Sequence, residues 1–231
     1  MGALAVGVVS RPVASTGVGR VVGWLALVGS LATIAYAGRL TAGKPDRDLL
    51  YQYSSAVGSL IQYGLLLGLL LLVSRGLDKR ELFALRAPSS VRGALKLGLG
   101  ALVSIYVVAA ALNPFLHAGE EQGLTPERWE PDRLGAYLAN AAVIVIVAPF
   151  VEELLYRGAG VTLLSRYGKV VAVLGASIAF GLAHGLVEGL PVLAFFGVAL
   201  AVLRMRTNSV VPGMVLHALF NGVALVAAVA V

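Results

Sequence analysis

Cysteine is absent from this chain of 231 residues, and charged residues are scarce. Without cysteine the protein cannot form a disulfide, and it has no thiolate to serve as a metal ligand or a nucleophile. Charged side chains account for 13% of the residues and hydrophobic ones for 58%, whereas a typical soluble domain carries about 25% charged residues. The composition therefore excludes an ordinary soluble domain and predicts an integral membrane protein with several helical spans.

Internal repeats, low-complexity tracts and proline-rich linkers are also missing, so nothing marks off a second, soluble domain. We divide the chain into a cytoplasmic N-terminal segment (residues 1–20), N-terminal transmembrane spans with an outer loop (21–133), and a transmembrane core that carries the polar motifs (134–231). The first segment lacks the ordered basic, apolar and cleavage regions of a signal peptide. We therefore expect the first span to be a retained anchor.

Seven apolar runs predict an all-α fold, a polytopic transmembrane bundle of about seven spans, with six and eight also compatible. Several runs are shorter than the ~20 residues that a helix needs to cross the bilayer, so their ends must extend into flanking polar residues. For the sixth run, the sequence leaves both a full and a partial crossing open. The runs are Val21–Ala37, Leu49–Val73, Leu97–Leu112, Leu134–Phe150, Val170–Leu186, Leu190–Leu203 and Val210–Val231.

Basic residues gather in four segments that alternate along the chain with acidic or mixed ones. The positive-inside rule makes the basic segments cytoplasmic, which puts the N-terminus inside and the C-terminus outside. The net charge is +6, but short basic segments between apolar runs are typical of membrane loops, so we expect the bilayer and no nucleic acid as a partner. The basic segments are Arg11 with Arg20, Arg75 to Lys96, Arg157 with Arg166 and Lys169, and Arg204 with Arg206; the outer ones are Arg39 to Asp48, Glu120 to Arg133, and Glu188.

The longest outer segment, Asn113 to Arg133, contains three prolines and Trp129. Proline interrupts regular structure, and tryptophan favours the membrane interface. This pattern predicts an irregular cap, which is either a solvated loop or a lid over a substrate site.

Ionised residues occur just beyond the fourth apolar run, in an otherwise lipid-like stretch, at Glu152, Glu153 and Arg157. Each costs at least ~2.5–3.5 kcal/mol near the bilayer centre, so such residues persist where they find partners or perform chemistry. Glu153 and Arg157 are four residues apart and can form an ion pair on one helical face, whereas Glu152 lies about 100° away and needs a different partner. Pro149 predicts that this helix starts or bends there, with freed backbone groups facing a water-filled cavity.

Three more polar residues lie in later apolar runs: His184 in the fifth, and His217 with Asn221 on one face of the seventh. If the fourth and fifth runs form a hairpin at Gly168, Glu152 and His184 are each sixteen residues from the turn, or roughly 24 Å. His217 lies roughly 16 Å beyond the turn that follows the sixth run. We therefore expect these side chains to surround one intramembrane cavity, which lies nearer the cytoplasmic half of the membrane.

A carboxylate and a histidine that converge on a water can act as a general base, and a second histidine with an asparagine can stabilise an oxyanion. This combination suits hydrolysis of an amide bond. The same residues, Glu152, His184 and His217, could instead bind a catalytic metal such as zinc, although the helical His-Glu-x-x-His motif is absent. Purely structural roles are the other alternative: helix-tying hydrogen bonds for the histidines or Asn221, and packing for Phe180.

At these residues the sequence resembles the CPBP family of intramembrane proteases, which includes type II CAAX prenyl endopeptidases and proteins linked to bacteriocin processing and self-immunity. The family pattern is Glu-Glu-x-x-x-Arg, then Phe-x-x-x-His, then His-x-x-x-Asn or Asp. All seven positions match in order, and the resemblance covers Leu134 to Val231. The matching residues are Glu152, Glu153, Arg157, Phe180, His184, His217 and Asn221.

The resemblance implies that Glu152 and His184 activate water and that His217 and Asn221 stabilise the oxyanion. Arg157 would hold Glu153 and the helix in place. Family accounts differ on whether a metal takes part. We expect none, since the sequence places no carboxylate near either histidine beyond Glu188, and a zinc site needs such carboxylates to orient its ligands.

The resemblance implies as substrate a membrane-associated protein or peptide, with a prenylated CAAX terminus as one form of it. A different class of function is a non-catalytic membrane protein, such as an immunity or scaffolding factor or a small transporter. The intact set of motif residues argues against a degenerate relative, and the absence of inverted repeats argues against a transporter.

Overall fold

The structure is a computed structural model that describes residues 17–42, 48–112, 114–116, 121, 126 and 128–229. Within these ranges the secondary structure is helical, with no strand, as the sequence predicts. Most of the expected N-terminal segment, 1–20, and much of the outer loop lie outside the described residues.

Six helices in the described part of the chain are long and apolar enough to cross a membrane, which confirms a polytopic transmembrane bundle. Leucine and valine side chains on their outer faces are exposed, as they should be where lipid is the solvent. The spanning helices are α1 (Val18–Ala42), α2 (Tyr53–Val73), α4 (Val91–Leu112), a continuous helix from Pro131 to Tyr167, α10 (Leu190–Thr207) and α11 (Val211–Val229).

The fifth apolar run forms a short helix, α9 (Lys169–Leu182), of 14 residues. The sixth run, whose full crossing the sequence leaves open, forms α10, which extends to Thr207 and with 18 residues is long enough to be a candidate span. The run that forms α10 continues through its arginines, since Arg204 is buried against neighbouring helices. The hairpin predicted at Gly168 is confirmed: this residue has φ of +105°, a conformation that glycine adopts without strain, and it separates the long helix from α9.

The sequence predicts that the long helix starts or bends at Pro149, but the helix does not start there and passes through this residue. It consists of η2 (Pro131–Arg133), α6 (Leu134–Ala142), η3 (Val143–Val147), α7 (Ala148–Glu152), η4 (Glu153–Gly160), α8 (Val161–Leu164) and η5 (Ser165–Tyr167). Two of these segments, η3 and η4, are π-helical. A π-turn inserts a residue into the helix and is frequent at functional sites.

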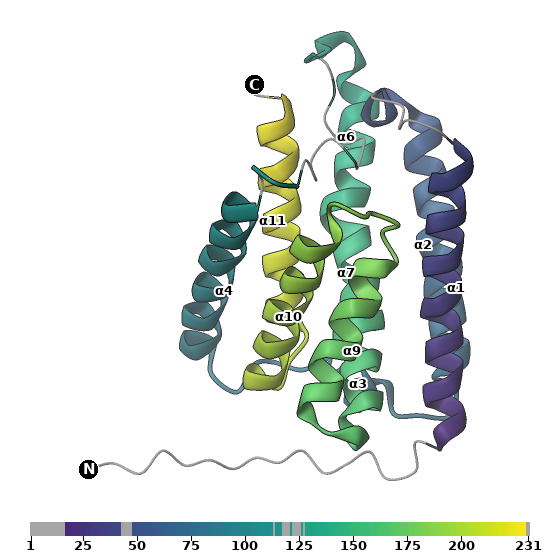
Figure 1. The fold of residues 1–231 in the computed structure, drawn as a ribbon, viewed down its shortest axis with the longest axis vertical. Helices are drawn as coiled ribbons and strands as arrows, with labels where there is room; N and C mark the ends of the chain where they lie inside the picture. Colours follow the sequence, from purple (N-terminus) through teal and green to yellow (C-terminus); the bar gives the residue numbers. More distant parts are fainter. Residues whose placement is uncertain are drawn as a thin grey trace.

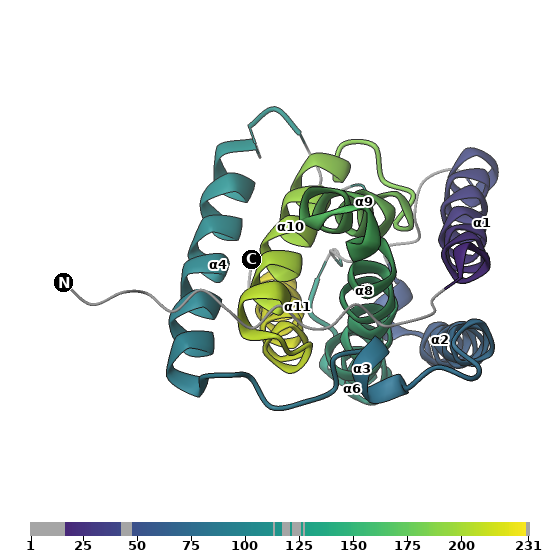
Figure 2. The same cartoon turned by 90° about the horizontal axis from the view of Figure 1, so that it is seen from below.

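The long helix is the axis of the bundle, and Figures 1 and 2 show the other helices arranged around it. It contacts α1 and α2 on one side, α9 and α10 on another, and α11 on a third. The α4 helix lies at the edge, packed mainly on α10 and α11 (Figure 2). A residue of the long helix can therefore meet side chains from several other helices.

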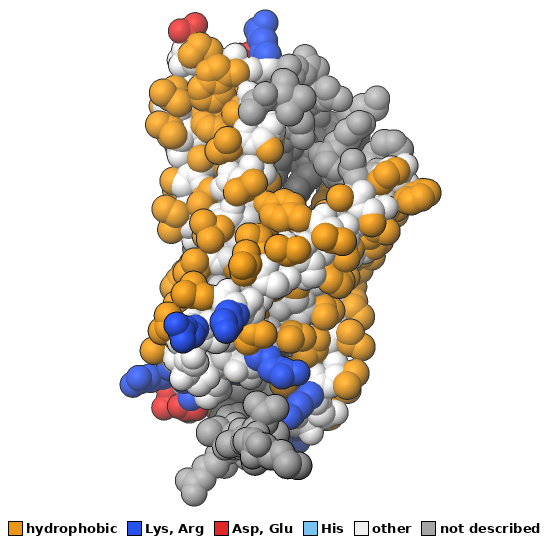
Figure 3. Space-filling model, turned by 90° about the vertical axis from the view of Figure 1, so that its left-hand side faces the viewer, with side chains coloured by type: hydrophobic (Ala, Val, Ile, Leu, Met, Phe, Trp, Pro, Cys, Tyr) orange, Lys and Arg blue, Asp and Glu red, His pale blue; other side chains and the backbone are white. Residues whose placement is uncertain are grey.

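Charged segments separate to the two ends of the bundle. At one end Arg20 of α1 donates to the backbone oxygen of Val73 at 2.6 Å, close to a short helix, α3 (Lys79–Leu82). Figure 3 shows Lys and Arg side chains gathered toward this end, below a band of hydrophobic side chains. At the other end Arg39 pairs with Glu121. Six apolar helices make the chain an integral membrane protein. Arg157, which the loop charges placed among the cytoplasmic basic residues, lies instead inside the bundle with its side chain buried.

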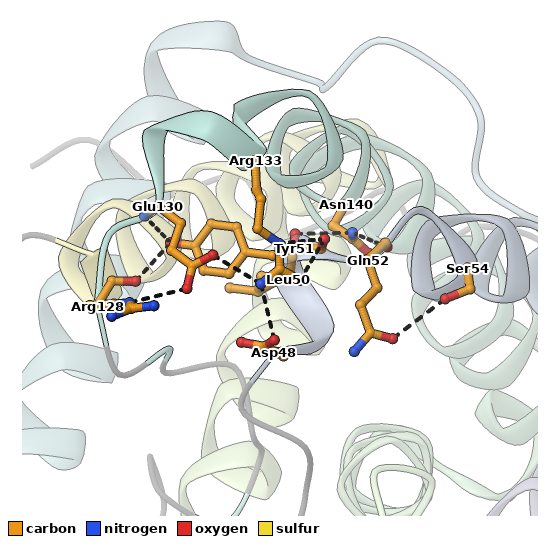
Figure 4. A network of polar contacts seen from close by, with 9 residues as sticks. All are labelled: Asp48, Leu50, Tyr51, Gln52, Ser54, Arg128, Glu130, Arg133 and Asn140. Carbon is orange, nitrogen blue, oxygen red and sulfur yellow. Dashed lines mark hydrogen bonds and ion pairs between the residues drawn. The ribbon is translucent and has the colours of Figure 1, made fainter.

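A polar clasp ties the connection between α1 and α2 to the start of the long helix (Figure 4). Arg133 donates to the backbone oxygen of Tyr51 at 3.0 Å, and its Nη1 lies 3.0 Å from Asp48 and 2.9 Å from Glu130. Hydrogen bonds from Arg133 and then from Arg128 lower the pKa of Glu130 below its ordinary value. The clasp fixes the entry of α2 into the bundle.

Aromatic rings support this clasp. Trp129 packs edge-on against Tyr137, with centroids 5.2 Å apart, and contacts Tyr51 at 6.4 Å. The Tyr137 hydroxyl donates to the backbone oxygen of Leu225 in α11 at 3.1 Å. Trp129 therefore packs at this end of the bundle, where the sequence placed an interfacial aromatic.

Candidate active site

The buried centre of the bundle holds an ion pair between Glu153 and Arg157. Arg157 Nη1 lies 2.9 Å from Glu153 Oε1, and both side chains are almost fully buried. The guanidinium also lies over the ring of Phe180, 4.2 Å from its centroid. The predicted ion pair at helical spacing is thus present, and the aromatic face adds a second partner for the cation.

His217 joins this cluster from α11. Its Nδ1 lies 3.1 Å from Glu153 Oε1, and its side chain is buried. Because a carboxylate only accepts hydrogen bonds, this contact places a hydrogen on Nδ1 and turns Nε2 the other way. Nε2 lies 3.8 Å from Oε2 of Glu152. A single imidazole therefore lies between the two adjacent carboxylates of the motif.

The expectation that no carboxylate other than Glu188 orients a histidine was wrong. Glu153 holds His217 from a neighbouring helix, and nothing in the spacing of either helix alone indicates that contact. The lack of an orienting carboxylate was the reason for expecting no metal, and for His217 that reason no longer holds.

Glu152 is the more accessible of the two carboxylates, with 12% of its side chain exposed against 0% for Glu153. Its Oε1 accepts a hydrogen bond from the hydroxyl of Tyr63 in α2 at 2.6 Å. Glu152 and Glu153 thus have different partners, as their angular separation on the helix predicts. Tyr63 had not been singled out, because a tyrosine within an apolar run gives no signal of its own.

His184 follows α9 directly, in a turn where Gly185 has φ of +65°. Its Nδ1 lies 2.8 Å from the carbonyl oxygen of Phe180. A carbonyl only accepts, so Nδ1 carries the hydrogen and Nε2 is left to accept a proton. Glu121 holds the segment between α9 and α10 in place, because its carboxylate accepts hydrogen bonds from the backbone N–H groups of Val187 and Gly189, at 2.8 and 2.9 Å.

Aromatic rings connect the two histidines. The ring of Phe180 lies 4.7 Å from that of His184 and 5.8 Å from that of His217, centroid to centroid. Phe196 of α10, which sequence reasoning missed, lies 4.9 Å from His217. These apolar walls keep the polar groups of the cluster apart from lipid.

Asn221 makes a hydrogen bond to a backbone oxygen that the π-turn before Pro149 would otherwise leave unpaired. Its Nδ2 donates to the backbone oxygen of Ile144 at 2.9 Å. In the π-helical register of η3, where Ala148 N–H bonds to Val143, the oxygen of Ile144 would require an N–H from residue 149. Proline has none, so the asparagine supplies the missing donor.

The long helix is held from outside at its second π-segment as well. Trp24 of α1 is fully buried, and its Nε1 donates to the backbone oxygen of Leu155 at 2.9 Å. Gly160 has no side chain to obstruct the indole, because a Cβ there would lie 2.6 Å from it. Arg204 donates to the backbone oxygen of Arg157 at 3.2 Å. These contacts fix the helix that carries both carboxylates.

Among the described residues, no three His, Asp or Glu side chains lie close enough together to hold a metal ion. The alternative metal set, Glu152, His184 and His217, therefore does not form a ligand cluster in this geometry.

An apolar groove of about 720 Å³ runs along α11. At 100° per residue, its α11 residues lie on the side of the helix opposite His217. The groove contains none of the four residues that were expected to surround a cavity, so it is separate from the polar cluster. It is lined by Val145, Val215, Ala218, Leu219, Gly222, Val223, Val226 and Ala227.

The fold and the cluster together define a class: a polytopic membrane protein with a carboxylate–histidine site inside its helical bundle. Residues 134–223 match the family model of type II CAAX prenyl endopeptidase Rce1-like proteins, which supports the resemblance of this region to the CPBP family. Comparison with curated proteins and with solved structures gives no match.

Proposed function

We propose that this protein is an intramembrane endopeptidase that hydrolyses a peptide bond in a membrane-associated protein or peptide, with a prenylated CAAX terminus as the substrate to test first. The observation that carries the proposal is the accessible carboxylate of Glu152, 3.8 Å from a histidine that a second carboxylate orients. A partly exposed carboxylate beside a histidine in an apolar bundle suits general-base chemistry.

In this proposal Glu152 and His184 activate the attacking water. A proton passes from water to Glu152 as the water oxygen bonds to the peptide carbonyl carbon, and the electron pair moves to the carbonyl oxygen. His184 has an acceptor nitrogen, Nε2, for the same water. Glu152 then gives the proton to the leaving amine nitrogen as the C–N bond breaks.

His217 and Asn221 are the proposed oxyanion stabilisers. The Nδ1–H of His217 is committed to Glu153, so His217 can donate from Nε2 only when both nitrogens carry hydrogen. One N–H of Asn221 is committed to Ile144, which leaves its second N–H for the substrate oxygen.

The proposed orientation places the basic end of the bundle in the cytoplasm, with the N-terminus inside and the C-terminus outside. A substrate anchored in the inner leaflet would then reach the site from the cytoplasmic side. We propose no cofactor, and a chelator experiment distinguishes this from dependence on a divalent metal such as zinc.

The test is cleavage of a farnesylated CAAX peptide by the purified protein in detergent, with and without a strong chelator. We expect Glu152→Gln and His184→Ala to lose at least about 100-fold in kcat while they keep the helical content and unfolding temperature of the wild type. Glu188→Gln, at an exposed position of the α9–α10 connector, is the matched control and should cleave normally.

Activity that survives chelation supports the metal-free mechanism, and activity that is lost and then restored by zinc overturns it. A folded wild type that cleaves neither the farnesylated peptide nor unmodified membrane peptides contradicts the protease assignment. A non-catalytic immunity or scaffolding protein would then be the remaining reading, and its partner binding would survive Glu152→Gln.

A further inference from the structure

Tyr63 brings a polar group from the N-terminal half of the chain to the site. It lies near the middle of α2 and is half-buried, whereas its neighbours Gln62 and Gly64 are exposed. Its hydroxyl lies 2.6 Å from Glu152 Oε1. Hydroxyl-to-carboxylate bonds of about 2.5–2.7 Å are charge-assisted and roughly twice as strong as neutral ones.

This bond makes the two oxygens of Glu152 unequal. Oε1 is occupied by Tyr63, whereas Oε2 faces Nε2 of His217 at 3.8 Å, beyond hydrogen-bond distance. A carboxylate that is held at one oxygen has less freedom to rotate about its last side-chain bond. Oε2 is therefore the oxygen that is presented to a reacting water.

We propose that Tyr63 is a positioning residue for this reaction, which holds the carboxylate of Glu152 with Oε2 toward the water. The role rests on the proposed function, in which Glu152 is the general base. A general base works only within hydrogen-bond reach of the proton it removes, so a carboxylate that rotates away contributes less.

The proposal also gives the N-terminal spans a part in the site. Tyr63 lies outside the family match, which begins at residue 134. The α2 helix packs against η3 and α7, the segments that lead into Glu152. Its entry into the bundle is fixed by the clasp around Arg133. The first spans of the chain are therefore more than a lipid anchor.

Two measurements on Tyr63→Phe test this role. In the infrared spectrum, the difference between wild type and Glu152→Gln isolates the carboxylate band of Glu152, and we expect Tyr63→Phe to displace that band. In the cleavage assay, we expect kcat to fall about tenfold, the effect of losing one such hydrogen bond, with little change in KM. Tyr137→Phe is the control, since it removes a hydroxyl bonded to Leu225 far from the site, and it should change neither quantity.

An unmoved carboxylate band overturns the contact, and a displaced band with unchanged kcat overturns the positioning role. A KM increase with unchanged kcat also overturns it, because that pattern indicates substrate binding. If the wild type cleaves no peptide, the catalytic role fails with the proposed function. The band still shows, independently of activity, whether Tyr63 holds Glu152.

Discussion

His217 of α11 is bound to Glu153 of the long helix, with Nδ1 3.1 Å from Oε1 and both side chains buried. The second carboxylate of the Glu-Glu pair therefore has two partners, the predicted Arg157 and a histidine 64 residues further along the chain. This relationship divides the roles of the pair. Glu153 organises the cluster, whereas Glu152 remains the accessible carboxylate.

The Glu153–Arg157 pair should be essential for stability, and the losses caused by replacing its two residues should not be additive. Glu153→Gln leaves a buried guanidinium without its counter-charge, which should cost about 3–5 kcal/mol. Arg157→Met leaves the buried carboxylate of Glu153 without its counter-charge, at a similar cost. The double variant should recover much of the loss, because neither charge is then left alone. Chemical unfolding of the four proteins in detergent measures this, and additive losses would contradict the pairing.

Gly213 should tolerate no side chain, because a Cβ there would lie 2.7 Å from Glu153 Oε2. We expect Gly213→Ala to displace the carboxylate and to destabilise the protein by about 1–3 kcal/mol, the usual cost of overpacking. Gly68→Ala is the matched control in a helix, since a Cβ there meets nothing within 4 Å. The control should be neutral or more stable by up to about 1 kcal/mol. Equal unfolding temperatures for the two variants would argue against close packing at Gly213.

Asn221 and Pro149 should show coupled effects on stability. Asn221→Ala leaves the Ile144 oxygen without a donor, at a cost of about 1–3 kcal/mol. Pro149→Ala restores a backbone N–H at the position that the π-register requires, so the double variant should lose less than the sum of the single changes. Unfolding free energies of the cycle provide the measurement. Independent effects would mean that the asparagine does not compensate for the proline.

Glu130 should make the stability of the clasp depend on pH. Its folded-state pKa is lowered by Arg133 and Arg128 from the ordinary 4.5. Its contribution is therefore present above that ordinary value and is lost as the pH falls through the lower, folded-state pKa. Glu130→Gln should unfold at a lower temperature than the wild type near neutral pH, and the difference should shrink below about pH 4.5.

Unfolding temperatures from neutral pH to about pH 3 provide this comparison, with Glu188→Gln as a control at an exposed position. A difference between Glu130→Gln and the wild type that stays constant over that range would rule out the proposed ionisation. A steeper acid response in the variant than in the wild type would have the wrong sign.

The sequence by itself determined the class of the protein and most members of the cluster. Ionised residues in a lipid-like stretch are tolerated only with partners, so Glu152, Glu153 and Arg157 were evident from their positions in the sequence. Their spacing predicted the Glu153–Arg157 pair, because neighbours at four residues are set by the geometry of a single helix. The turn at Gly168 could be predicted for the same reason, since it depends on local conformation.

Tertiary structure decided what joins the helices. The contact of His217 with Glu153, the bond from Tyr63 to Glu152, and the bond from Asn221 to Ile144 each depend on the rotation and depth of one helix against another. The π-turns also change that rotation, so helical periodicity in the sequence cannot predict it. In a membrane, where lipid and protein side chains are equally apolar, helix pairing is determined by close packing and polar contacts that appear only in the folded bundle.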